Sequence, residues 1–125
     1  GDDTRELNEI IADDERLLTK IGITADEIAD RLEYFYDEAY NSFEEEIIID
    51  KTYKIKLLSV RGKILCPFSH PAGFPKGMIT FTNLKYNEVL EWTPLNIHMI
   101  RDHHFFEGRN STHRLDPEIC KKLLF

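Results

Sequence analysis

Basic side chains gather near the C-terminal end of the chain, where seven of them fall between positions 98 and 114. They are His98, Arg101, His103, His104, Arg109, His113 and Arg114. Arginine binds phosphate or carboxylate through two parallel hydrogen bonds, and histidine can add donors or transfer protons. Only Asp102 and Glu107 oppose these charges within the window. The spacing therefore predicts a His/Arg-rich corner that binds an anionic ligand or partner.

Nucleic acid would be a more extended partner of the same kind, because further basic residues lie upstream. They are Lys54, Lys56, Arg61 and Lys63. Contacts to phosphates would make the affinity fall steeply with salt, but no known nucleic-acid-binding motif supports this interpretation. The opposing interpretation is that Arg101, Arg109 and Arg114 pair with acidic residues of the N-terminal half of the same chain.

A second candidate site would hold a transition metal between Cys66, His70, His98 and His103. Zinc takes four thiolate or imidazole ligands in a tetrahedron, commonly two from a loop and two from a helix, and it is the one cofactor suggested here. A spacing of five residues turns His98 and His103 about 140° apart on a helix, which counts against the pair unless the helix opens before His103. If all four converge, the chain would be a small zinc-dependent hydrolase or nuclease.

His98 and Asp102 stand four residues apart, a spacing that brings a carboxylate to an imidazole on one face of a helix. Such a pair fixes the tautomer of a catalytic base, but it does the same for a purely structural histidine. The chain contains no G-x-S-x-G, C-x-x-C or H-E-x-x-H motif that would supply a nucleophile or a zinc site. The sequence therefore favours a non-catalytic domain and names no catalytic residue.

The composition indicates one soluble domain spanning residues 1–125. Apolar residues make up 42% of the chain, and Phe, Tyr and Trp number 8, 5 and 1, which is enough for a packed core. Two cysteines are too few for a disulfide scaffold, and no apolar run is long enough to cross a bilayer. The acidic start does not resemble a signal peptide, so a reducing, cytoplasmic location is expected.

The net charge of −7 hides a division of the chain into two oppositely charged parts. Residues 1–50 carry 17 acidic and 4 basic residues, a net charge of −13, whereas residues 51–125 carry 6 and 12, a net charge of +6. The simplest interpretation is that the two parts pack together and neutralise each other. A third function class is an acidic adaptor or neutralising protein that presents its helices to a basic partner.

Two helices are predicted in the acidic part, which we expect to form a helical hairpin over residues 1–46. The first should run over residues 4–20, with Asp3 and Glu6 in the spacing of a capping box and Gly22 ending it. The second should begin at the capping box of Thr24 and Glu27 and continue to about residue 44.

Beyond residue 46 the pattern changes to the alternation of strands. Residues 47–49 and 53–58 should form two strands, and a tight hairpin turn at 60–63 should lead into a third at 64–66. The proline- and glycine-rich residues 67–77 exclude regular structure. Residues 78–82 and 89–92 should then form a further pair of strands.

The chain should end in two helices. Thr93 and Pro94 are typical of a helix start, and we expect that buried helix to continue to about residue 106, with Gly108 ending it. Asp116 and Pro117 should begin a short terminal helix. The predicted fold is therefore α+β: an acidic helical hairpin packed on an antiparallel sheet of about four strands, in a basic β-meander with two helices over residues 47–125.

Overall fold

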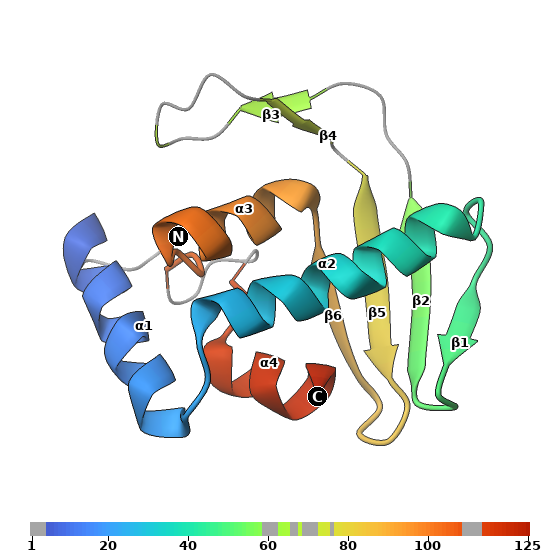
Figure 1. Cartoon of the computed structure of the whole chain (residues 1–125), viewed down its shortest axis with the longest axis horizontal. Helices are drawn as coiled ribbons and strands as arrows, with labels where there is room; N and C mark the ends of the chain where they lie inside the picture. The colour runs from blue at the N-terminus through green and yellow to red at the C-terminus, as the bar shows by residue number, and fades with distance from the viewer. Residues whose placement is uncertain (1–4, 59–62, 66–67, 69–72, 76, 109–113) are drawn as a thin grey trace.

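The fold is α+β, as predicted: two N-terminal helices packed on a four-stranded antiparallel sheet, followed by two further helices (Figure 1). The computed structural model describes residues 5–58, 63–65, 68, 73–75, 77–108 and 114–125. Its elements are α1 (Leu7–Ile21), α2 (Ala25–Asn41), β1 (Ile47–Ile49), β2 (Tyr53–Leu58), β3 (Lys63–Leu65), β4 (Gly73–Pro75), β5 (Met78–Asn83), β6 (Glu88–Trp92), α3 (Pro94–His103) and α4 (Pro117–Leu124).

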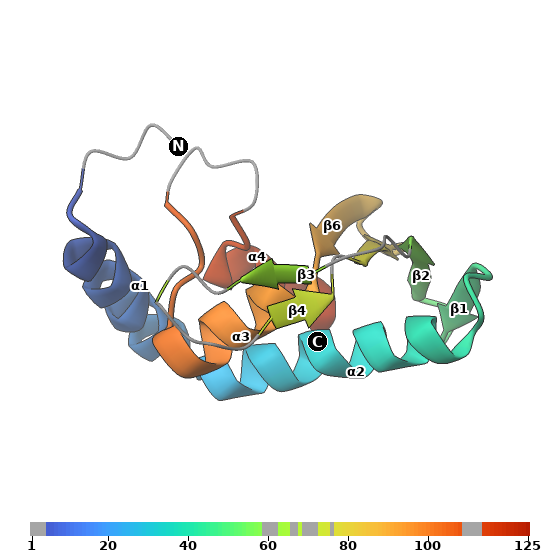
Figure 2. The same cartoon turned by 90° about the horizontal axis from the view of Figure 1, so that it is seen from above.

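The four-stranded sheet has the order β1-β2-β5-β6, with every neighbouring pair antiparallel. The register aligns alternate apolar residues across the strands, so that Ile55 faces Phe81 and Leu57 faces Ile79. Because side chains alternate between the two faces of a strand, these residues all point to one face, which α2 crosses. Figure 2 shows α2 running along that side of the sheet.

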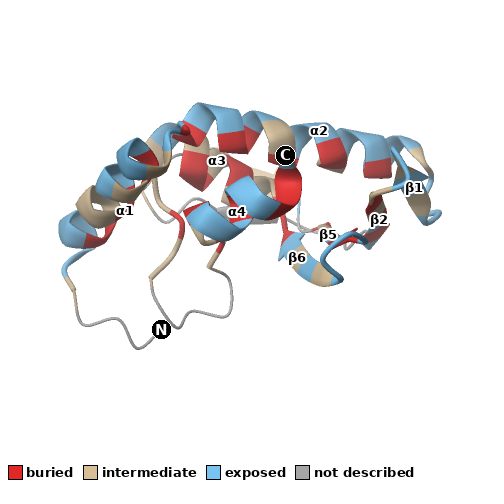
Figure 3. Ribbon diagram, turned by 90° about the horizontal axis from the view of Figure 1, so that it is seen from below, coloured by how far each residue is buried: buried red, intermediate tan, exposed pale blue. Residues whose placement is uncertain are grey.

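The core between α2 and the sheet is built from aromatic rings. Phe35 of α2 is fully buried, and its ring centroid lies 5.0 Å from that of Tyr53 and 4.9 Å from that of Phe81. Trp92 packs against Phe81 and donates its indole N–H to the carbonyl of Leu32 at 3.2 Å. Figure 3 shows the buried residues of α2 on the side that faces the sheet and α4, with exposed residues on its far side.

The N-terminal helices follow the predicted order, with corrected ends. α1 begins at Leu7 rather than residue 4, and its N-cap residue Glu6 makes no capping side-chain bond; Asp3, the expected cap, lies outside the described residues. Gly22 ends α1 in the left-handed conformation, as predicted. The Thr24–Glu27 capping box of α2 is confirmed, with both reciprocal bonds present.

The two helices, α1 and α2, pack against different elements. α1 lies against α4, whereas α2 packs against α3, α4 and β2. α2 ends at Asn41 instead of continuing to residue 44, because Phe43 and Glu44 both adopt positive φ angles, of 54° and 66°. A helix cannot continue through such residues.

The strand pairing corrects two expectations. β2 pairs with β1 and β5, while β3 pairs with β4, so the strand after residues 60–63 is not the hairpin partner of β2. The sheet is therefore a meander into which a separate two-stranded ribbon, β3–β4, is inserted. Regular structure at Gly73–Pro75 was not expected; a proline is tolerated there because both strands of the ribbon are edge strands. The ribbon lies above α3 in Figure 1.

α3 begins as predicted but ends earlier. Its N-cap Thr93 donates its backbone N–H to Asn96 Oδ1 at 2.9 Å, and Pro94 occupies the first turn. The helix closes at His103 rather than near residue 106, because His104 has a φ of +52° and its N–H returns to the Ile100 carbonyl at 3.1 Å. The terminal helix α4 starts at Pro117 after the predicted N-cap Asp116, whose carboxylate accepts two backbone N–H groups.

Candidate functional site

Arg101 of the predicted anion site is held by the acidic helix α2. Its Nη2 donates to Asp30 Oδ1 at 2.8 Å and to Glu33 Oε2 at 2.7 Å. This is the intramolecular pairing that the opposing interpretation of the charge division expects. An incoming anion would have to displace two carboxylates from this guanidinium.

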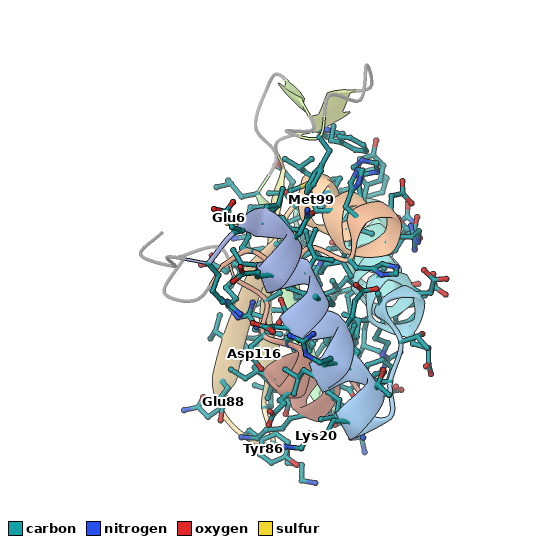
Figure 4. The ribbon with its side chains drawn as sticks, turned by 90° about the vertical axis from the view of Figure 1, so that its left-hand side faces the viewer. Glu6, Lys20, Tyr86, Glu88, Met99 and Asp116 are labelled. Atoms are coloured by element: carbon teal, nitrogen blue, oxygen red, sulfur yellow. The ribbon has the colours of Figure 1, made fainter. Side chains whose placement is uncertain are left out.

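Arg114 is held in the same way by α1. Its Nη2 donates to Asp14 Oδ1 at 2.8 Å, and its Nη1 donates to Asp14 Oδ2 at 3.0 Å and to the Glu107 carbonyl at 2.6 Å. Asp116, which Figure 4 shows beside α1, lies 3.5 Å away. Burial lowers the pKa of Arg114, but the hydrogen bond and charge of Asp14 outweigh it and leave the pKa raised.

His104 also faces α1, with Nδ1 at 3.2 Å from Glu15 Oε2. Three of the seven predicted ligand-binding side chains thus meet carboxylates of the N-terminal helices. Two more, Arg109 and His113, lie outside the described residues. Arg101 therefore lies against α2, whereas Arg114 and His104 lie against α1.

His98 and His103 do come together. Their ring centroids are 5.0 Å apart and the rings are nearly perpendicular, although helical spacing alone turns the residues apart. Phe74 stacks on His98 at 4.6 Å and Phe68 stacks on His103 at 4.2 Å. Asp102 Oδ2 lies 2.8 Å from His98 Nδ1, as the i, i+4 spacing predicts. Each imidazole is thus stacked on one phenylalanine ring.

The other two predicted metal ligands, Cys66 and His70, lie outside the described residues. Each stands two positions from Phe68, the residue that stacks on His103. Across the described ranges, no group of three or more His, Cys, Asp or Glu side chains is arranged to hold a metal ion. The described residues therefore supply two of the four expected ligands side by side.

The outer side of α2 carries the acidic surface that the adaptor interpretation of the sequence requires. Six of its 17 residues are exposed carboxylates. Four of them, Asp26, Asp30, Glu33 and Asp37, follow one another at helical spacing and form what we call the acidic stripe. The stripe extends about 16 Å along the helix.

The single basic residue of α2, Arg31, does not neutralise the acidic stripe. Its guanidinium lies 4.6 Å from the ring centroid of Phe35 and 5.3 Å from that of Tyr53, and its Nε donates to the Leu124 carbonyl at 2.6 Å. Arg31 therefore serves the contact between α2, the sheet and α4. The outer side of the helix keeps an excess of negative charge.

The turn after α2 exposes two aromatic side chains next to this charge. Phe43 is 90% exposed and Tyr40 is 67% exposed, and they are followed by the exposed residues Glu44, Glu45 and Glu46. Ser42 Oγ lies 2.7 Å from the Ala39 carbonyl and 2.8 Å from that of Glu45, which fixes the turn. Exposed aromatic rings on an ordered turn are suited to contact another protein.

A pocket of about 310 Å³ opens between α2, α3 and β4. Its apolar lining is Tyr36, Phe74, Pro75, Pro94 and Ile97. Its polar lining is Glu33, Asp37, His98, Arg101 and Asp102. The Tyr36 hydroxyl donates to the Gly77 carbonyl at 3.3 Å, and a Cβ at Gly77 would stand only 2.8 Å from that hydroxyl oxygen. Glycine at position 77 therefore allows the Tyr36 hydroxyl to approach the backbone closely, and this contact holds Tyr36 in the wall of the pocket.

No protein-family model, curated protein or solved structure matches this chain. The described helices include none that is long and apolar enough to cross a lipid bilayer.

Proposed function

We propose that this chain is a non-catalytic protein-interaction domain that presents the acidic stripe of α2 to a basic protein partner. The observation that carries the proposal is the exposure of all four stripe carboxylates on one side of a helix whose own arginine is turned inward, although two of the four, Asp30 and Glu33, also bind Arg101. Long-range attraction between opposite charges speeds the encounter of such partners and selects among them.

The pairing of Arg101 and Arg114 favours this function over the binding of an anion. Both guanidiniums already make charge-assisted hydrogen bonds of 2.7–3.0 Å to carboxylates of α1 and α2. Among the residues that the structure describes, no lysine or arginine pairs with Asp26 or Asp37. The exposed Phe43 and Tyr40 at the end of α2 would add the apolar anchors that interfaces commonly contain.

Neutralising the stripe should weaken the binding of a basic probe. We expect the variant Asp26→Asn, Asp30→Asn, Asp37→Asn to bind fluorescein-labelled decalysine about tenfold more weakly than wild type at low salt, from roughly 0.5 kcal/mol for each exposed charge. Fluorescence anisotropy titrations measure the difference. The affinity of the wild type should fall as salt rises, because exposed charges are screened.

The matched control removes the same charge elsewhere, through Glu9→Gln, Asp50→Asn and Glu118→Gln, three exposed positions outside α2. This control should bind decalysine within about twofold of wild type, since a distant exposed charge contributes little. Equal weakening by both triple variants would mean that only net charge matters, and would contradict a specific acidic face.

A zinc site at Cys66, His70, His98 and His103 is a second candidate, favoured by the contact between the His98 and His103 rings. A carboxylate on one nitrogen of an imidazole, as Asp102 provides for His98, is the usual outer partner of a zinc-bound histidine. A zinc-dependent hydrolase or nuclease would use three of these side chains as ligands, because the fourth position of a catalytic zinc ion must hold water.

Elemental analysis tests the zinc proposal directly. Protein purified without chelators or nickel columns should contain close to one zinc per chain, and His98→Ala or His103→Ala should remove most of it. His104→Ala is the control, because that imidazole faces Glu15 and should leave the zinc content unchanged. A wild-type content far below one per chain rules the site out.

A further inference from the structure

We propose that the pocket between α2, α3 and β4 receives one lysine or arginine side chain of the basic partner. This inference rests on the proposed function and adds the site at which one side chain of the partner binds. Asp37 lies in both features, since it ends the acidic stripe and lines the pocket. The acidic stripe would attract the basic partner, and the pocket would bind one of its side chains in a specific contact with Asp37.

The pocket has the size and the lining that a long basic side chain needs. A volume of about 310 Å³ is at the lower end of the range of small-ligand pockets. Phe74, Pro94, Ile97 and Tyr36 provide apolar surface for the methylene groups of the stem. Lysine and arginine characteristically bury that stem while their charged end stays near polar groups.

The charges around the pocket leave one carboxylate available to a cation. The only arginine of the lining, Arg101, is bound to Asp30 and Glu33, and Asp102 is paired with His98. Within the described part of the chain, no cation lies within ion-pair distance of Asp37. An incoming ammonium or guanidinium group can therefore pair with Asp37 without breaking an ion pair between described residues.

Electrostatic repulsion at Asp37 also favours the binding of a cation in the pocket. Partial burial raises the pKa of this carboxyl group, and the negative charges of Glu33 and Glu38 raise the pKa further. A cation in the pocket would relieve that repulsion, because an opposite charge nearby stabilises the ionised carboxylate.

The test uses N-acetyl-lysine methylamide, N-acetyl-arginine methylamide and the uncharged N-acetyl-norleucine methylamide as probes. In ¹H–¹⁵N NMR titrations at low salt, we expect saturating shifts at residues lining the pocket with a basic probe and not with norleucine. Asp37→Asn should weaken that binding about fivefold or more, as expected for loss of a direct charged contact.

Glu38→Gln is the matched control. It removes one exposed carboxylate from the next position of the same helix, outside the pocket lining, and should change the affinity for the basic probes less than twofold. Absence of shifts with both basic probes, equal shifts with norleucine, or equal weakening by the two variants would overturn the pocket. In each of these cases, the proposed function of the acidic stripe would still stand if the wild type binds decalysine. If decalysine does not bind the wild type, the proposed function itself is contradicted.

Discussion

Replacing Asp14 with alanine is expected to lower the free energy of unfolding by about 3 to 5 kcal/mol, the usual cost of removing one member of a buried ion pair. The Asp14 side chain is only 4% exposed and that of Arg114 is 13% exposed. Without the carboxylate, the Arg114 guanidinium would remain buried with two of its hydrogen bonds lost. The segment before α4 would then lose its attachment to α1.

The neighbouring variant Asp13→Ala is the control for Asp14. Asp13 pairs with Arg5 and with Arg16, whose side chain is 70% exposed, so its replacement should cost about 1 kcal/mol or less. Urea unfolding followed by circular dichroism measures both variants. Costs that agree within their errors would show that the Asp14–Arg114 pair does not hold the C-terminal segment on α1.

Replacing Phe35 with alanine should be equally damaging, for a different reason. Its ring is fully buried between α2 and the sheet, in contact with Tyr53 and Phe81. Removing it leaves a cavity and costs about 3 to 5 kcal/mol, which should lower the melting temperature by roughly 10 °C or more. The midpoint of thermal unfolding reports the change.

Tyr34→Ala provides the comparison for Phe35. Tyr34 is the preceding residue of α2, touches the Phe35 ring at its edge and is 40% exposed. Its loss should cost about 1 kcal/mol. If Phe35→Ala were no more destabilising than Tyr34→Ala, the helix–sheet core described above would not be the main source of stability.

The starts of α2 and α3 were predictable because their chemistry is local. The Thr24–Glu27 capping box and the Thr93–Pro94 pair each act within one turn of backbone. The end of α3 was not predictable in the same way. His104 adopts a left-handed conformation that glycine normally marks, so Gly108 was the more reasonable end.

The strand partners depended on contacts that no short pattern reveals. The turn residues 60–63 suggested that β2 continues into β3, but β2 pairs with β5 and leaves β3 to pair with β4. Period-two alternation predicts which residues are strands and which face is buried. It does not choose between alternative partners of similar composition.

The candidate site illustrates the same limit. The division of charge along the sequence predicted attraction between the two halves, and Arg101 and Arg114 do bind carboxylates of α2 and α1. Their partners lie about 70 to 100 residues away, so they could not be assigned from spacing. The pocket was missed because Glu33 and Asp37 meet His98 only when α2 packs on α3.

The most direct test of the acidic stripe is to locate where a basic probe binds. We expect unlabelled decalysine, added to ¹⁵N-labelled wild-type protein at low salt, to shift amide signals along residues 26–46 and to leave those of β6 and α4 in place. Shifts confined to positions 103–114, which lie outside the pocket lining, or no saturable shifts at all, would contradict the account.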